Sequence, residues 1–311
     1  MQHEKKIISL LKKPEHIKQL IKEWGLELFF HFLSINIAKG QGEVEGLITL
    51  SKYLRDTRFL PLLYHILFHY NLNYNQIDRI EQEIVFLGGS WPYSWKDTAT
   101  SPMIYIPAGF FVMGSNKGTQ REAPARKLYL PGFFIDKYPV TFIEFKSFIT
   151  KTNYKTHSGW EKHYSQERLH CPVVSISWVE ARDFCKYLGK RLPREAEWEK
   201  AARGSRGYTW PWGNQWEEGK ANTLEMKLGT TLQRGSFPQG ASPYGVEEMA
   251  GGVWEWVWDS LSPYHKEIKI AKGGSYLYSK DFARSSYRFL GSQWGWERDL
   301  GFRCVWSAES K

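Results

Sequence analysis

Cysteine is scarce in this sequence, and its three cysteines lie far apart. Cys171, Cys185 and Cys304 form no CxxC pair, and no cysteine–histidine pair has the spacing of a zinc ligand set. An odd and scattered set argues against a disulfide-stapled scaffold and against a structural zinc site. We expect Cys185 and Cys304 to be buried neighbours that keep structural thiols.

Long apolar runs are also missing. No segment holds 18 uninterrupted apolar residues, and the first twenty residues, MQHEKKIISLLKKPEHIKQL, have no cleavage-site pattern. The sequence therefore predicts neither a membrane span nor a signal peptide, and a cytoplasmic location is the expectation.

Basic residues are in excess but are not concentrated. The net charge is +9, from 42 Lys and Arg against 33 Asp and Glu, and no run of basic residues occurs. Nucleic-acid tracks usually need such a run or stripe, so a solvated basic surface is the better interpretation. We expect no nucleic-acid partner.

The chain divides into two parts of different texture. In residues 1–90, apolar residues recur at three- and four-residue steps, which predicts a small bundle of four helices. We expect this bundle to be an interaction module. Residues 91–102 are rich in turn-forming types and are interpreted as a linker. Residues 103–311 are then a second domain.

The second domain has the pattern of an α+β fold. Short β-like runs at Met103–Pro107 and Gly109–Met113 alternate with turns, and helices are expected at Thr141–Thr150 and Trp178–Leu188. A further capped helical start is expected around Glu195. In the run GGVWEWVWD, three tryptophans stand two residues apart, as on one face of a strand: Trp254, Trp256 and Trp258.

Several motifs in this domain occur in the order found in one known family. They are IPAGFFVMGS (106–115), PVVSISWVEARDFCKYLGKRLPREAEWEKAARG (172–204), WPWGN (210–214), YGVEEMAGGVWEWVWD (244–259), KGGSY (272–276) and LGFRC (300–304). With them the chain resembles the formylglycine-generating-enzyme (sulfatase-modifying factor) family. The resemblance covers residues 103–306 and implies a C-type-lectin-like fold.

The same resemblance argues against the copper-dependent catalysis of this family. Formylglycine-generating enzymes hold copper on two cysteines in the stretch that matches GGSYLYSKDFARSSYR (273–288). Aligned from its GGS start, this chain has Tyr278 and Ala283 at those two positions. Neither side chain replaces a thiolate as a ligand of the soft Cu(I) ion, so no copper is expected.

Calcium is a second expectation from the resemblance. Family members bind calcium in the segment that matches Glu248–Glu255, where carboxylates of Glu248 and Glu255 and the carbonyls of Gly251 and Val253 would be the ligands. Hard oxygen donors suit Ca²⁺, although a hydrogen-bonded turn is the alternative interpretation. A second family site would use Asn222 and the carbonyl of Thr223, but no downstream acid follows in MKLGTTLQRG.

A related enzyme class leaves another alternative open. Ergothioneine-type sulfoxide synthases pair a similar domain with a helical bundle that carries an iron motif of two histidines and a carboxylate. His65 and His69 stand four apart on a predicted helix, but Asn71 replaces the carboxylate. Ordinary helix histidines are the alternative.

Non-catalytic relatives supply the favoured interpretation. The chain resembles retroelement-diversified variable proteins in a frame of Gly273–Ser275, Arg284-Ser285, Arg288 and Gly301–Arg303. Aromatic and basic side chains on and between these positions are good ligand contacts, since they combine large area with polar tips. The candidate ligand-binding residues are Tyr276, Tyr278, Lys280, Phe282, Arg284, Tyr287, Phe289, Gln293, Trp294, Trp296 and Arg298.

The sequence thus predicts a non-catalytic binding protein. A protein or peptide would bind the C-terminal segment, and a second protein partner would bind the N-terminal helices. A diversified variable protein and a subunit of a bacterial defence or signalling complex are both compatible with this. A metal-dependent oxidoreductase of the same superfamily is the alternative.

Overall fold

The computed structural model describes residues 101–306 together with five single residues before them, namely Lys22, Ser51, Leu63, Ile80 and Glu83. The predicted bundle of residues 1–90 lies outside the described residues apart from those five. Most of the linker 91–102 also lies outside them, as do residues 307–311. The bundle and the domain boundaries therefore stay predictions.

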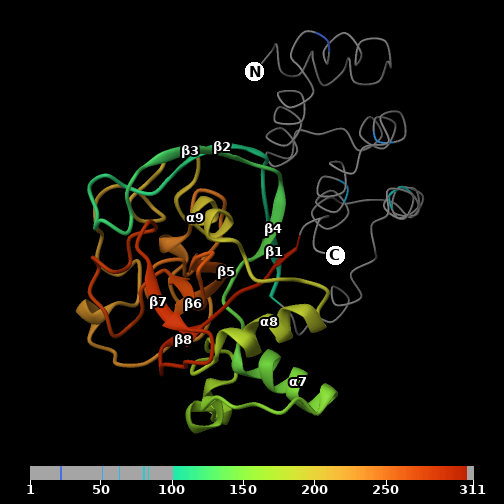
Figure 1. The fold of residues 1–311 in the computed structure, drawn as a ribbon. Helices are drawn as coiled ribbons and strands as arrows, with labels where there is room; N and C mark the ends of the chain where they lie inside the picture. The colour runs from blue at the N-terminus through green and yellow to red at the C-terminus, as the bar shows by residue number, and fades with distance from the viewer. Residues whose placement is uncertain are drawn as a thin grey trace.

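Nine strands form three small sheets in the described part of the chain (Figure 1). The strands are β1 Met103–Ile106, β2 Gly109–Met113, β3 Arg126–Leu130, β4 Phe133–Asp136, β5 Trp254–Ser262, β6 His265–Lys272, β7 Phe289–Ser292, β8 Leu300–Gly301 and β9 Val305–Trp306. Their orders are β1-β4-β9, β2-β3 and β7-β6-β5-β8. Pairing is antiparallel except between β5 and β8.

Three α-helices and four short 3₁₀ turns connect these sheets. They are α7 Phe142–Thr152, η3 Trp160–His163, η4 Gln166–Arg168, α8 Trp178–Tyr187, α9 Glu195–Arg203, η5 Leu224–Met226 and η6 Pro238–Gly240. The predicted α+β class is confirmed for the second domain, and the helices and strands predicted there lie within a residue or two of the observed ones.

Two of the helices begin at residues whose side chains cap them. Before α7, the Thr141 backbone N–H donates to the Glu144 carboxylate at 2.7 Å. Before α8, the Ser177 N–H donates to the Glu180 carboxylate, and the Glu180 N–H donates to the Ser177 hydroxyl oxygen. Such capping boxes satisfy backbone donors that the first helical turn leaves free. These local signals explain why the starts of both helices follow from the sequence.

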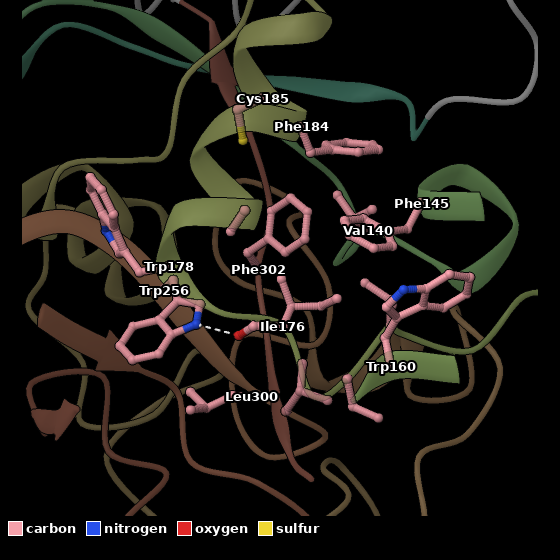
Figure 2. Close-up of a cluster of buried hydrophobic side chains, with 14 of the residues drawn as sticks. Val140, Phe145, Trp160, Ile176, Trp178, Phe184, Cys185, Trp256, Leu300 and Phe302 are labelled. Atoms are coloured by element: carbon pink, nitrogen blue, oxygen red, sulfur yellow. Dashed lines mark hydrogen bonds between the residues drawn. The ribbon is translucent and has the colours of Figure 1, made fainter. Parts of the chain in front are cut away.

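A core rich in aromatic side chains lies between α7, α8 and β5 (Figure 2). Phe145 and Phe184 stack at 5.9 Å, and both contact Phe302 from the C-terminal end of the domain. Trp256 of β5 donates from its indole nitrogen to the carbonyl of Ile176 at 2.8 Å. The C-terminal residues are therefore part of the core and not an appendage to it.

Strand β5 carries the three tryptophans that the sequence places on one face. Trp254 and Trp256 are fully buried, but Trp258 is 45% exposed. The pairing of β5 with β6 shifts its register between Trp256 and Ser260. Trp258 nevertheless packs on Trp178 with ring centroids 5.6 Å apart, and Trp178 belongs to the cluster that holds Trp254 and Trp256. The three tryptophans therefore lie on the same side of the strand, and only the last is exposed.

Helix α9 packs against β2, β5 and β6 and carries much of the buried charge. In residues 101–306, no helix has both the length and the apolar character needed to cross a membrane.

Candidate ligand-binding site

Each of the three arginines of the C-terminal frame binds a buried glutamate from another part of the chain. The pairs are Arg284 with Glu122, Arg288 with Glu195, and Arg303 with Glu255. Each pair is bidentate, a geometry in which the planar guanidinium matches the carboxylate. The frame residues are therefore anchors of the segment and not free ligand contacts.

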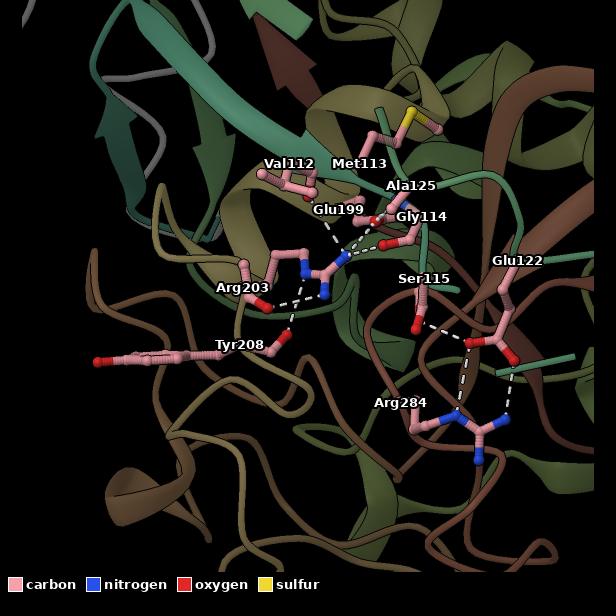
Figure 3. Close-up of polar contacts among 12 residues, drawn as sticks. Val112, Met113, Gly114, Ser115, Glu122, Ala125, Glu199, Arg203, Tyr208 and Arg284 are labelled. Atoms are coloured by element: carbon pink, nitrogen blue, oxygen red, sulfur yellow. Dashed lines mark hydrogen bonds and ion pairs between the residues drawn. The ribbon is translucent and has the colours of Figure 1, made fainter. Parts of the chain in front are cut away.

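The Arg284–Glu122 pair joins the C-terminal segment to the loop between β2 and β3 (Figure 3). Arg284 donates to Glu122 at 2.8 Å, and the Ser286 hydroxyl donates to the same carboxylate at 2.6 Å. Burial would raise the pKa of Glu122, but these hydrogen bonds and one from the Thr119 N–H outweigh burial and lower it to about 2. Arg284 was predicted to contact a ligand, but its side chain is engaged here.

The Arg303–Glu255 pair is fully buried in the centre of the domain. Arg303 donates to the Glu255 carboxylate at 2.6 and 2.7 Å, and the Trp198 indole donates to it at 2.7 Å. The same guanidinium donates to the backbone carbonyls of Asp136 and Lys137. Burying a charged side chain costs desolvation energy, and these hydrogen bonds and the ion pair offset that cost.

The two positions where the family carries copper cysteines differ in exposure. Ala283 is fully buried and packs closely on Gly274. A Cβ atom added to Gly274 would lie 2.9 Å from the Cα of Ala283. Tyr278 is half-buried, with its ring 5.5 Å from that of Trp254 and 5.2 Å from that of Phe282. A methyl group packed against backbone and a phenol in an aromatic cluster leave no soft donor at either position.

The cysteines lie elsewhere, as expected. Cys185 and Cys304 are buried neighbours with their sulfur atoms 2.9 Å apart, which confirms that expectation. Burial raises the pKa of Cys304, and it also raises the pKa of Cys171. Protonated, buried thiols are poor nucleophiles and poor metal ligands.

The predicted ligand-binding residues fall into three groups by burial. Tyr276 is buried, and its hydroxyl donates to the carbonyl of Arg298 at 3.2 Å. The half-buried side chains are Tyr278, Phe282, Arg284, Tyr287, Phe289 and Gln293. The exposed ones are Lys280, Trp294, Trp296 and Arg298. Only the exposed group, together with the outer edges of the half-buried rings, is available to a partner.

The half-buried rings form one cluster around Trp254. Phe289 stacks on the Trp254 ring at 5.2 Å, and Tyr287 lies at 5.9 Å from it. Phe282 in turn lies 5.0 Å from Tyr287. Aromatic pairs at these separations contribute to stability beyond the area that they bury. This cluster attaches the C-terminal segment to strand β5.

The sequence analysis missed a loop that borders this segment. In residues 224–228, three apolar side chains are exposed, namely Leu224, Met226 and Leu228. The Leu224 N–H donates to the carbonyl of Tyr278 at 2.9 Å, and the Lys280 N–H donates to the Glu225 carboxylate at 3.0 Å. Alternating apolar residues within a turn-rich stretch were the available signal for this loop.

Among the four predicted calcium ligands, the Glu255 carboxylate already has a cationic partner in the fold. The Glu255 carboxylate is neutralised by Arg303, whose positive charge would also repel a cation. Glu248 lies on left-handed backbone (φ 59°) and accepts a hydrogen bond from the Gly235 N–H at 2.7 Å. Burial raises its pKa to about 7.

The remaining metal predictions stand as follows. Gly251 and Val253, whose carbonyls were the other two predicted ligands, are both held in the fold. The Gly251 N–H donates to the carbonyl of Gly273 at 2.7 Å, and the Val253 side chain is buried in the core. At the second family position, Asn222 keeps a buried side-chain oxygen without a hydrogen-bond donor. No group of three or more histidine, cysteine or acidic side chains suited to a metal occurs among the described residues. His65 and His69 lie outside them.

Comparison with known proteins establishes the family. Residues 93–308 match the sulfatase-modifying factor enzyme 1-like domain, so the chain belongs to this family. The inactive C-alpha-formylglycine-generating enzyme 2 of Mus musculus is 30% identical over 264 residues, covering 66% of this chain and 86% of that protein. The formylglycine-generating enzyme of Mus musculus is 29% identical over 285 residues, covering 68% and 76%. The chain is therefore about equally identical to a named enzyme and to a relative named as inactive.

Two solved structures share the fold. The structure of PvdO from Pseudomonas aeruginosa has a TM-score of 0.60 at 24% identity, covering 67% of this chain and 95% of that one. Treponema denticola variable protein 1 has a TM-score of 0.56 at 21% identity, covering 65% and 94%. The predicted likeness to variable proteins is thus confirmed at the level of the fold.

Proposed function

We propose that this protein is a non-catalytic, cytoplasmic binding protein whose C-terminal segment, residues 273–303, contacts a protein or peptide. One observation carries the proposal. Tyr278 and Ala283 stand where the family resemblance expects copper cysteines, while the arginines around them keep their buried glutamate partners. The scaffold of the segment is retained without the donors of the copper chemistry.

The preserved frame supports binding because it fixes the backbone in advance. Three ion pairs to buried glutamates hold the segment, so a ligand would not have to order it, and ordering costs reduce affinity. Trp294 is 60% exposed and Trp296 is 39% exposed on this fixed backbone. Tryptophan and arginine are the side chains that most often dominate binding energy at interfaces.

Two finer proposals concern the biological setting. The segment is a diversified region of a variable protein, or the chain is a subunit of a bacterial defence or signalling complex. A reverse-transcriptase gene beside this one, with a near-copy of the codons for 273–303, would support the first. A second protein partner for the helices of residues 1–90 completes the proposal.

A selection experiment tests the binding function. Random peptides displayed on phage are panned against the full-length protein, and the affinities of the selected peptides are then measured by calorimetry. We expect the double variant Trp294→Ala/Trp296→Ala to weaken binding at least tenfold. The matched aromatic control is Tyr264→Ala, because Tyr264 is 91% exposed between β5 and β6. Equal affinity for all three proteins would contradict the proposal.

An oxidoreductase is the competing function, and metal analysis separates the two. The 29% identity to a named formylglycine-generating enzyme supports this competing function. Stoichiometric copper or iron in the purified protein, lost on His65→Ala or His69→Ala substitution, together with oxygen consumption on thiol substrates, would replace the binding proposal. We expect the purified protein to contain less than about a tenth of a copper or iron ion per chain.

A further inference from the structure

Four basic side chains from separate parts of the chain converge beside the exposed end of the C-terminal segment. Lys162 and His163 belong to η3, Arg168 belongs to η4, and Arg298 precedes β8. Arg168 donates to the carbonyl of His163 at 3.0 Å and to the hydroxyl of Thr231 at 2.7 Å. These bonds hold the Arg168 guanidinium beside η3.

The basic side chains of this cluster form no ion pair within the described domain, although a buried carboxylate lies near one of them: burial raises the pKa of Asp299, and the charge of Arg298 lowers it. Across residues 101–306, no carboxylate lies within ion-pair distance of Lys162, Arg168 or Arg298. By contrast, the frame arginines and the buried lysines Lys190 and Lys272 all have carboxylate partners. An unpaired group of like charges raises the local potential and favours an anion from outside.

The pKa of the His163 imidazole is lowered by burial and by the same positive charges. Burial lowers its pKa, and the charges of Arg168, Arg298 and Lys162 lower it further. Glu161 and Glu167 are exposed neighbours in sequence, but neither is among the charges that shift the His163 pKa. The imidazole therefore faces cations from η3, η4 and the C-terminal segment.

An exposed tryptophan borders the basic cluster. Trp296 packs directly on Gly159, where a Cβ would lie 2.7 Å from the indole ring. The ammonium of Lys162 is 5.8 Å from the centre of the same ring. The ring is thus fixed against the loop that carries the cations, with part of its surface open to solvent. A flat apolar surface next to positive charge suits a ligand with both characters.

We infer that Lys162, His163, Arg168 and Arg298 bind the carboxylates of an acidic peptide segment that packs on Trp296. This inference rests on the proposed binding function and names the chemistry of the partner. Guanidinium groups form strong charge-assisted hydrogen bonds with carboxylates, and an unpaired cluster gains a counter-ion by doing so. A compact cluster of four side chains favours a peptide over a nucleic acid, whose backbone needs an extended track of contacts.

The direct test uses an acetylated hexaglutamate peptide as the probe, titrated into the full-length protein at low ionic strength. We expect binding by calorimetry, and we expect Lys162→Gln/Arg298→Gln to weaken it at least tenfold. The control Lys266→Gln removes an exposed charge from β6 and should change the dissociation constant less than twofold. Hexaglutamine should not bind. Equal weakening by the control would show non-specific attraction to a basic protein and would overturn the inference.

A second readout follows His163 by NMR. Carboxylates that approach the imidazole stabilise its charged form, so hexaglutamate should raise the His163 pKa. A single-stranded hexanucleotide serves as the comparison anion. If it binds more tightly than hexaglutamate through the same residues, the assignment to a peptide is wrong.

The two proposals fail in distinguishable ways. Selected peptides that need Trp296, lack acidic residues and keep their affinity for Lys162→Gln/Arg298→Gln would overturn this inference and leave the binding function standing. Selected peptides that ignore both sets of residues would overturn both.

Discussion

Single charged side chains decide how the C-terminal segment is held. The glutamates that receive the frame arginines are all buried, and a buried carboxylate without a partner costs several kcal/mol. Each arginine therefore contributes most through the penalty that its absence would leave. This explains why the frame arginines are engaged inward while Arg298, which has no carboxylate partner in the described domain, faces outward.

Acid should unfold the protein in a window set by Glu122. Its folded pKa of about 2 lies below the ordinary value of 4.5. Its stabilising contribution, about 2–3 kcal/mol, is therefore complete above pH 4.5 and is lost as the pH falls toward 2. Urea unfolding of the wild type and Glu122→Gln between pH 5 and pH 2.5 measures this. The variant should be less stable at pH 5 and show a shallower loss on acidification, whereas Glu218→Gln should follow the wild type.

Glu255 should matter to stability whether or not calcium is present. Its carboxylate neutralises Arg303, so Glu255→Gln leaves a buried guanidinium without its counter-ion and should cost roughly 3–5 kcal/mol. Thermal unfolding in EGTA and in calcium chloride is the measurement. We expect the same drop in melting temperature in both buffers. A drop seen only with calcium would restore Glu255 as a metal ligand.

At the scale of elements, local signals explain what the sequence could predict. Helices α7 and α8 start directly after Thr141 and Ser177, because each of these capping residues has a glutamate three residues later to complete the cap. Strand β2 follows its alternation of buried and exposed residues. The spacing of the tryptophans predicts the shared face of Trp254, Trp256 and Trp258, but it does not predict that Trp258 is 45% exposed, because spacing does not show where the core ends.

The contact between Gly159 and Trp296 can be tested as an element-level connection between the η3 loop and the C-terminal segment. Gly159 has φ −101°, which alanine adopts without strain, so Gly159→Ala acts through the added methyl group alone. We expect the displaced Trp296 ring to become more accessible to acrylamide quenching and the melting temperature to fall slightly. In a Trp296→Ala background, the same substitution should have little effect. Equal destabilisation in both backgrounds would place the cause elsewhere.

At the scale of the whole molecule, the candidate site is assembled from parts distant in sequence. The frame and the exposed aromatic residues of the C-terminal segment could be found in the sequence because they lie within about thirty residues of one another. Lys162, His163 and Arg168 could not be connected with Arg298, because nothing in their spacing predicts that η3, η4 and the C-terminal segment meet. The engagement of Arg284 was missed for the same reason, since Glu122 lies 162 residues away.

The three arginine–glutamate pairs also have an order in time. Glu122, Glu195 and Glu255 precede their partners by 162, 93 and 48 residues, so during synthesis every one of these acids leaves the ribosome before its arginine exists. A nascent chain that ends before residue 284 would have to bury three carboxylates without counter-ions, which opposes compaction. The domain should therefore fold late, after its last strands are made, and chains arrested at residue 280 should remain sensitive to protease.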